Sequence, residues 1–225
     1  MLAALIALAL TPPAAALPDQ AERRLMLTGF DRVRVDGPFV VEVRAGPGPN
    51  RVVGDPRSIE AVQVRVDGRT LVISAARDDR GRPIAVPSPV VELSNDRLTA
   101  IAADGAGTIR IDRMVGPRID IALSGDGIVT IGAVDAEVVN AVVIGSGRLS
   151  LSGKAGQGRF AVNGPGSIDA VGLTTDMLQV RSEGAGNSRY RARYTADVSA
   201  EGSGSVTVDG SPQCRQRGTA TIRCG

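Results

Sequence analysis

The chain has 225 residues and a formal net charge of +2, a size that one hydrophobic core can fill without a second domain. It contains 28 glycines, no Trp and no His, and only 2% of its residues are aromatic. Without His, a Ser-His-Asp triad is excluded. The scarcity of aromatic residues beside basic ones argues against a nucleic-acid partner. Apolar volume supplied by Val, Ile, Leu and Ala, together with abundant Gly, favours short strands joined by tight turns.

The N-terminus predicts an export signal over residues 1–16. Leu2 to Leu10 form an apolar run, Pro12-Pro13 interrupt it, and Ala14 to Ala16 offer small residues for cleavage. The run is shorter than the roughly 20 residues that span a bilayer, so we expect no transmembrane segment in the mature chain. No Lys or Arg precedes the run, which departs from the usual signal layout. We expect an exported protein of the periplasm, outer membrane or cell surface.

The two cysteines, Cys214 and Cys224, both lie near the C-terminus. In an oxidising compartment they are expected to pair and to close a short loop, with residues 211–225 capping the fold; two free buried thiols are the alternative. A zinc site is not expected, because two thiolates without any His cannot complete four ligands.

Six Gly-x-Gly triplets recur in the C-terminal half, and their first positions are 20, 20, 19, 20 and 18 residues apart. This regularity indicates an internal repeat of about 20 residues. The glycines of these expected structural turns are Gly105 and Gly107, Gly125 and Gly127, Gly145 and Gly147, Gly164 and Gly166, Gly184 and Gly186, and Gly202 and Gly204.

Between the triplets the pattern has period two. After the first triplet, Ile109 and Ile111 flank the polar Arg110, and before it Ile101 and Ala103 alternate with other residues. Each repeat therefore predicts two short strands on either side of a Gly-x-Gly turn, with apolar side chains inward and polar ones outward. A second turn is expected near mid-repeat, as at Gly116-Pro117.

Two strands and two turns per repeat predict one coil of a solenoid. Stacked coils would share a continuous core and hold like residues in columns. We therefore expect an all-β fold, a single-stranded parallel β-helix, right-handed by the usual preference of parallel crossovers. An antiparallel meander with hairpin loops at the triplets is the alternative. The repeat by one full coil favours the solenoid.

The residues before the triplets predict less regular strands. Phe30 to Val35 and Phe39 to Val43 alternate around Asp36-Gly37-Pro38, and Gln63 to Val66 pairs with Leu71 to Ser74 across a turn. Pro56 to Val62 is expected to form one helical turn, and the Pro-rich Arg77 to Pro89 a surface loop. We predict a linker over 17–28 and a single β-helix domain over 29–225.

The series from Phe30-Asp31-Arg32-Val33-Arg34-Val35 through Leu71-Val72-Ile73-Ser74 to the Gly-x-Gly train resembles a bacterial family, the putative auto-transporter adhesin, head GIN domain. The resemblance covers about residues 29 to 210. It implies a pectin-lyase-like β-helix without lyase residues, located in the cell envelope or at the surface, with an adhesion role. Four of the six triplets depart from the Gly-Ser-Gly form, and the fifth coil is expected to point Ser182, Ser188 and Tyr190 inward.

The most distinctive outward stretch carries Arg189, Arg191, Arg193 and Tyr194. Guanidinium groups in this pattern could bind an anionic glycan or lipid headgroup, although a solvated sheet face is the simpler interpretation. For catalysis, Glu183 and Glu201 both precede a triplet and would stack on adjacent coils at a separation that suits an acid/base pair. Solvated turn residues are the simpler interpretation.

These features favour a non-enzymatic envelope or surface protein, adhesion-like or structural, that uses the outward faces of a β-helix. A carbohydrate-active enzyme using Glu183 and Glu201 is the first alternative, and a scaffold in an envelope assembly the second. We expect a glycan or an envelope or surface protein as partner and leave homo-oligomerisation open. No cofactor and no metal are expected.

Overall fold

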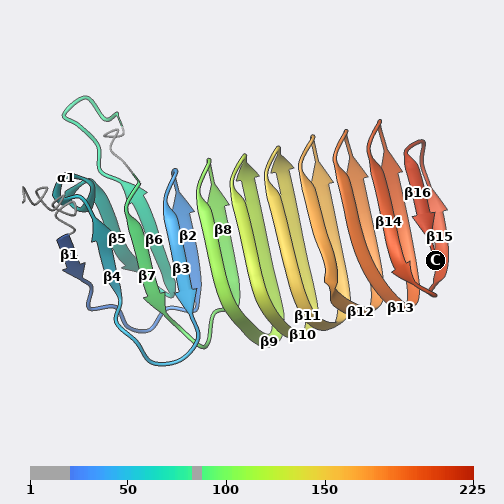
Figure 1. Cartoon of the computed structure of the whole chain (residues 1–225), viewed down its shortest axis with the longest axis horizontal. Helices are drawn as coiled ribbons and strands as arrows, with labels where there is room; N and C mark the ends of the chain where they lie inside the picture. The colour runs from blue at the N-terminus through green and yellow to red at the C-terminus, as the bar shows by residue number, and fades with distance from the viewer. Residues whose placement is uncertain (1–20, 83–87) are drawn as a thin grey trace, which may run out of the picture.

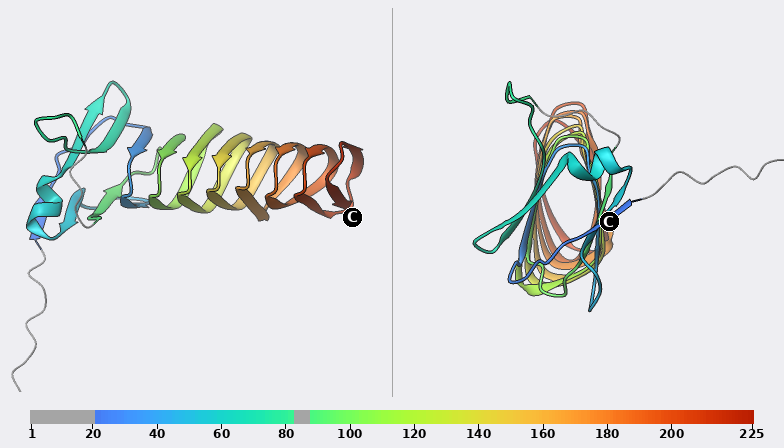
Figure 2. Two further views of the ribbon diagram at one scale, coloured as in Figure 1. Left: turned by 90° about the horizontal axis from the view of Figure 1, so that it is seen from above. Right: turned by 90° about the vertical axis from the view of Figure 1, so that its left-hand side faces the viewer.

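Two sheet faces wind around one narrow interior in this protein, as the computed structural model shows for residues 21–82 and 88–225 (Figures 1 and 2). The coils stack in register, so that Ile109 aligns with Val129 and Val129 with Leu149. Consecutive coils pair in parallel, which confirms the parallel solenoid over the antiparallel meander. Its strands are β8 (Ala100–Asp104), β9 (Thr108–Gly125), β10 (Ile128–Gly145), β11 (Arg148–Asn163), β12 (Ser167–Glu183), β13 (Asn187–Glu201), β14 (Ser205–Gly210), β15 (Gln213–Arg217) and β16 (Thr221–Cys224).

The Gly-x-Gly triplets lie at one edge of the solenoid, between the strands of successive coils. Gly145 has φ +103°, and a Cβ built on it would lie 2.6 Å from the carbonyl oxygen of Gly125 in the coil below. Only glycine combines this backbone conformation with so close an approach of neighbouring backbones. We name the sheet leading into these turns the pre-turn face and the sheet leading out of them the post-turn face.

The second turn expected at mid-coil is a bend within a continuous strand. Gly116-Pro117, for example, lies inside β9. The ladder continues around this corner because the same backbone path recurs in the coil above and below. Register shifts, such as the one between Ile131 and Val134, accompany the unequal coil lengths. Each regular coil thus contains one long bent strand where the sequence predicts two short ones.

The alternating apolar residues of the repeats point inward and are buried, as predicted. Within the fifth coil Tyr190 is fully buried, and its ring lies 5.0 Å from that of Phe160. Ser188 is buried beside it and accepts a hydrogen bond from the amide of Ile168 at 3.1 Å. The inward side chains of the irregular fifth coil, Ser182, Ser188 and Tyr190, are therefore part of the core. At this level of the solenoid the Phe160–Tyr190 pair fills the interior, where other coils use aliphatic side chains.

The coil that stacks on the first triplet coil comes from much earlier in the chain. Strand β2 pairs with β8 and β3 pairs with β9, so residues 30–44 lie directly against residues 100–111. Residues 45–82 and 88–99 leave this stack and build the N-terminal end (Figure 2). The elements of this region are β1 (Ala21–Arg24), β2 (Arg32–Asp36), β3 (Val40–Arg44), β4 (Arg51–Gly54), α1 (Pro56–Glu60), β5 (Val62–Asp67), β6 (Thr70–Ala75) and β7 (Val90–Ser94).

At this end the pairing changes from parallel to antiparallel. Strands β6 and β7 extend the two faces in parallel with β2 and β3, and β5, β4 and β1 then add antiparallel strands. The predicted pair of strands around Gly68 and the helical turn at α1 are confirmed. The range expected as a linker, 17–28, includes β1. Residues 83–87 of the expected surface loop lie outside the described residues.

The C-terminal coil is closed by the predicted disulfide between Cys214 and Cys224. Cys214 aligns with the inward Ala196 and Cys224 with the inward Val208, so the bond crosses the end of the interior from one face to the other. Neither α1 nor any other helix of the described residues is long and apolar enough to cross a membrane.

Replacing Gly145 by Ala should destabilise the protein by about 1–3 kcal/mol, because the new Cβ meets the Gly125 carbonyl and φ is positive. Chemical denaturation would measure the loss. Ser146→Ala, at the exposed middle position of the same triplet, is the matched control. Equal stability of the two variants would contradict this account of the turn.

Replacing Cys214 by Ser should cost about 3 kcal/mol under oxidising conditions, because the short loop that the bond closes becomes free in the unfolded chain. The melting temperature, recorded with and without reductant, checks this. The variant should match the reduced wild-type protein. An unchanged melting temperature in oxidising buffer would show that the bond does not stabilise the last coil.

Candidate functional site

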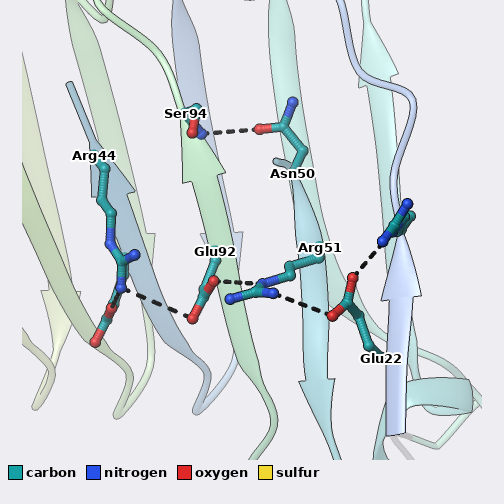
Figure 3. Close-up of polar contacts among 8 residues, drawn as sticks. Glu22, Arg44, Asn50, Arg51, Glu92 and Ser94 are labelled. Atoms are coloured by element: carbon teal, nitrogen blue, oxygen red, sulfur yellow. Dashed lines mark hydrogen bonds and ion pairs between the residues drawn. The ribbon is translucent and has the colours of Figure 1, made fainter. Parts of the chain in front are cut away.

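A ladder of alternating charges crosses the N-terminal end of the post-turn face (Figure 3). The Arg51 guanidinium donates to Glu92 at 2.6 Å and to Glu22 at 3.1 Å, joining β4 to β7 and to β1. Arg44 of β3 approaches Glu92 at 3.9 Å. The Glu92 hydrogen bond is the main cause that raises the pKa of Arg51 above its usual value. The ladder joins the antiparallel N-terminal strands to the parallel solenoid, so we assign it a structural role.

A second ion pair fixes the entry to β2. Arg69, in the turn between β5 and β6, donates to the Asp31 carboxylate, with an Nε–Oδ2 distance of 3.1 Å. The hydrogen bond from Arg69 is the main cause that lowers the pKa of Asp31 below its ordinary value. The Asp31 carbonyl also accepts from the Thr99 amide at 2.8 Å. Asp31 therefore links three segments that are distant in the chain.

The predicted arginine cluster lies on the post-turn face of β13 and at the corner that follows. Arg189, Arg191 and Arg193 are exposed, and the Arg193 guanidinium lies 5.1 Å from the centre of the exposed Tyr194 ring. Acidic residues of neighbouring coils lie beside all three: Asp169 is 3.8 Å from Arg189, Asp176 is 3.3 Å from Arg193, and Asp209 aligns with Arg191. The cluster is thus much less positive than the sequence alone indicates.

The two carboxylates considered for catalysis do stack on adjacent coils. Glu183 aligns with Glu201 across β12 and β13, and both are exposed. Glu183 accepts a hydrogen bond from Arg181 at 2.8 Å. Tyr190, another ionisable group nearby in sequence, is buried in the core, which raises its pKa well above the ordinary value. This arrangement of exposed, partly ion-paired carboxylates does not resemble an acid/base pair held in a cleft.

The pre-turn face carries a hollowed surface that the sequence analysis did not single out. Three open hollows of about 450, 160 and 580 Å³ adjoin one another, and Val142 lines all of them. Their shared floor is a column of small outward residues in register on four strands, which we call the trough: Ala102, Ala122, Val142 and Ala161.

Polar side chains border the trough on the side away from the Gly-x-Gly edge. Asp120, Asn140, Arg159 and Gln179 follow one another in register, one per coil. The Asn140 amide donates to Asp120 at 2.8 Å. The column of the trough ends in Arg34 on one side and in Arg181 on the other. Arg34 donates a hydrogen bond to Asp36 at 2.9 Å, and Arg181 donates one to Glu183 at 2.8 Å. A comparison of outward positions at the 20-residue period would have revealed this column, because apolar residues recur there where polar ones are expected.

Parallel β-solenoids with uninterrupted outward faces form a class of proteins that present extended surfaces. The chain belongs to the family described as putative auto-transporter adhesin, head GIN domain, whose model matches residues 29–212. No curated protein matches the chain. The family and the disulfide together indicate an extracellular or envelope protein.

Solved structures share this fold. A putative adhesin from Bacteroides fragilis is 21% identical with a TM-score of 0.83, and the match covers 92% of this chain and 97% of that one. A putative lipid binding protein from Parabacteroides distasonis is 17% identical with a TM-score of 0.72, covering 92% and 96%. A putative adhesin from Parabacteroides merdae is 14% identical with a TM-score of 0.68, covering 92% and 96%. These neighbours are described as adhesins or binding proteins, not as enzymes.

Replacing Asp31 by Asn should remove a pH-dependent part of the stability. The ionised carboxylate stabilises the folded protein above the ordinary pKa of 3.8, and this contribution is lost as the pH falls through the lower folded-state value. The melting temperature of the wild type should therefore fall more steeply than that of the variant below about pH 4. Asp96→Asn, an exposed neighbour, is the control. Parallel curves for wild type and Asp31→Asn would contradict the role of the ion pair.

Proposed function

We propose that this chain is an exported, non-enzymatic protein of the periplasm, outer membrane or cell surface with an adhesion-like role. Its ligand would bind to the outward faces of the solenoid. One observation carries this proposal: outward side chains form straight columns to which each coil contributes one residue. The backbone under each column is hydrogen-bonded to the coils above and below. Such columns repeat about every 4.8 Å and can contact an extended ligand many times.

Several features support an envelope location. The apolar run at residues 2–10 fits an export signal, with residues 29–225 as the exported β-helix domain. A disulfide in the last coil, within the proposed cap 211–225, is suited to an oxidising compartment. The adhesin and lipid-binding descriptions of the structural neighbours agree with a surface ligand.

We further propose that Arg189, Arg191, Arg193 and Tyr194 contact an anionic group of a surface ligand, such as an acidic sugar or a lipid headgroup. Their side chains are exposed and come from one strand and its corner. The ion pairs with Asp169 and Asp176 join side chains that are about half exposed, so their strength is small and an incoming anion can replace them.

Binding of the full chain to an array of acidic and neutral polysaccharides and to anionic vesicles, run beside a turnover assay, tests this proposal. We expect binding without turnover. The triple change of Arg189, Arg191 and Arg193 to Ala should weaken binding to acidic probes roughly tenfold and reduce its salt dependence, because it removes three cations. Changing the exposed Arg65, Arg97 and Arg113 to Ala is the matched control. Turnover that is lost in Glu183→Gln or Glu201→Gln would replace this proposal with an enzyme.

A further inference from the structure

The trough on the pre-turn face is a second surface, on the opposite side of the solenoid from the arginine cluster. We propose that it binds an uncharged, linear glycan that runs along the solenoid axis. The inference rests on the proposed function, because it names a ligand class and a binding surface for a protein of that kind. Four properties of the trough carry it: its floor, its border, its charge balance and its dimensions.

The floor is aliphatic and accessible. Ala122 and Val142 are exposed, with 40% of Val142 accessible, and Ile144 beside them is 53% accessible. An outward column in a soluble solenoid ordinarily carries polar residues, as the column of Asp120 and Asn140 does. A row of methyl groups in a hollow offers van der Waals contact to the C–H face of a sugar ring without filling the space above it.

The border supplies donors and acceptors at the coil spacing. Asn140 uses one amide hydrogen on Asp120 at 2.8 Å and has further hydrogen-bonding capacity. Arg159 donates from one terminal nitrogen to Gln157 at 3.1 Å and retains other N–H groups. In the described part of the chain, the Gln179 side chain makes no hydrogen bond. Planar amide and guanidinium groups of this kind bind vicinal hydroxyl groups through two hydrogen bonds at once.

The charges around the hollows balance closely, so the trough needs no charged ligand to neutralise it. Five arginines and four aspartates line the three hollows. Arg34 is held by Asp36 at 2.9 Å, and Arg118 by Asp120 at 3.0 Å. A polyanion would therefore meet carboxylates nearly as often as cations along the trough.

The dimensions fit a slender chain. Arg34 and Arg181 lie five strand spacings apart, so the trough between them extends roughly 24 Å along the solenoid. A sugar ring in an extended chain is of the same order of length as the strand spacing of about 4.8 Å, so successive sugars can contact successive coils. The trough and its polar border, two columns of outward residues across this length, offer roughly 300 Å², well below the ~800 Å² per partner of a stable protein interface. A second copy of the chain is therefore a poorer occupant.

An alkyl chain is also a poorer occupant than a glycan. Apolar ligands bind in cavities that bury most of their surface behind apolar walls. Here the aliphatic floor is one residue wide on each strand except β10, where Ile144 adds a second, and Asn140, Arg159 and Gln179 border it on one side. The ligand must satisfy these polar groups while it contacts the methyl groups, which hydroxyl-bearing rings do and an alkyl chain does not.

Calorimetric titration of the full chain with cello- and chito-oligosaccharides of increasing length tests the proposal. Affinity should rise with length and level off once the oligosaccharide spans the trough. Ala122→Glu, which places a longer, charged side chain in the floor, should weaken binding at least roughly tenfold, and Asn140→Ala several-fold. Thr130→Glu is the matched control, because it adds the same side chain at an exposed outward position of the post-turn face. An unchanged melting temperature of each variant would establish that it is folded.

The outcomes separate this inference from the proposed function. Glycan binding that is insensitive to Ala122→Glu and Asn140→Ala would overturn the trough as the site and leave the proposed function intact. Binding could instead be restricted to acidic glycans or anionic vesicles and be lost when Arg189, Arg191 and Arg193 are changed to Ala. That result would also overturn the trough as the site and leave the proposed function intact. Competition by a single-chain detergent below its micelle concentration would replace the glycan with an amphiphile. Failure of every probe, acidic or neutral, to bind would overturn both proposals.

Discussion

Backbone hydrogen bonding between successive coils at about 4.8 Å is the constraint on which the rest of this structure depends. At the edge formed by the Gly-x-Gly triplets, the turn of each coil lies directly against the backbone of the previous coil. A Cβ on Gly125 would lie 2.9 Å from the Gly105 oxygen, and one on Gly145 would lie 2.6 Å from the Gly125 oxygen. Glycine at these positions allows the backbones to approach. Without that approach the ladders could not stay continuous around each coil.

The same constraint places functional side chains in columns. A residue and its counterpart one repeat later lie side by side on the same face, so a property that recurs in the sequence becomes a continuous stripe. Inward, the stripes form the core. Outward, they produce the trough floor from Ala102 to Ala161 and the polar border from Asp120 to Gln179. They also pair Arg189 with Asp169 across adjacent coils. Surface chemistry in this protein is therefore set by columns more than by short sequence motifs.

The N-terminal end is held together differently from the stacked coils. There the strands become antiparallel, the glycine column ends at Gly37, and charged side chains join the elements. Glu22, Arg51 and Glu92 connect three strands, and Asp31 with Arg69 joins the start of β2 to the turn between β5 and β6. An edge of a solenoid exposes backbone groups that could pair with other chains. Added antiparallel strands cover this edge, and at the opposite end the disulfide crosses the last coil.

The order of residues along the chain was enough to predict the repeat, the parallel solenoid, the inward residues and the cysteine pair. These depend on local spacing: glycine every 18 to 20 residues, and apolar residues at every second position. The tertiary structure alone decided that residues 30–44 stack on 100–111, because no local pattern encodes a contact across the intervening residues 45–99. It also decided the charge of the arginine cluster, since Asp169, Asp176 and Asp209 reach it from other coils. The column of the trough recurs at the repeat period, but its hollows depend on the tertiary structure, because side chains far apart in the chain, such as Arg34 and Ala122, line the same hollow.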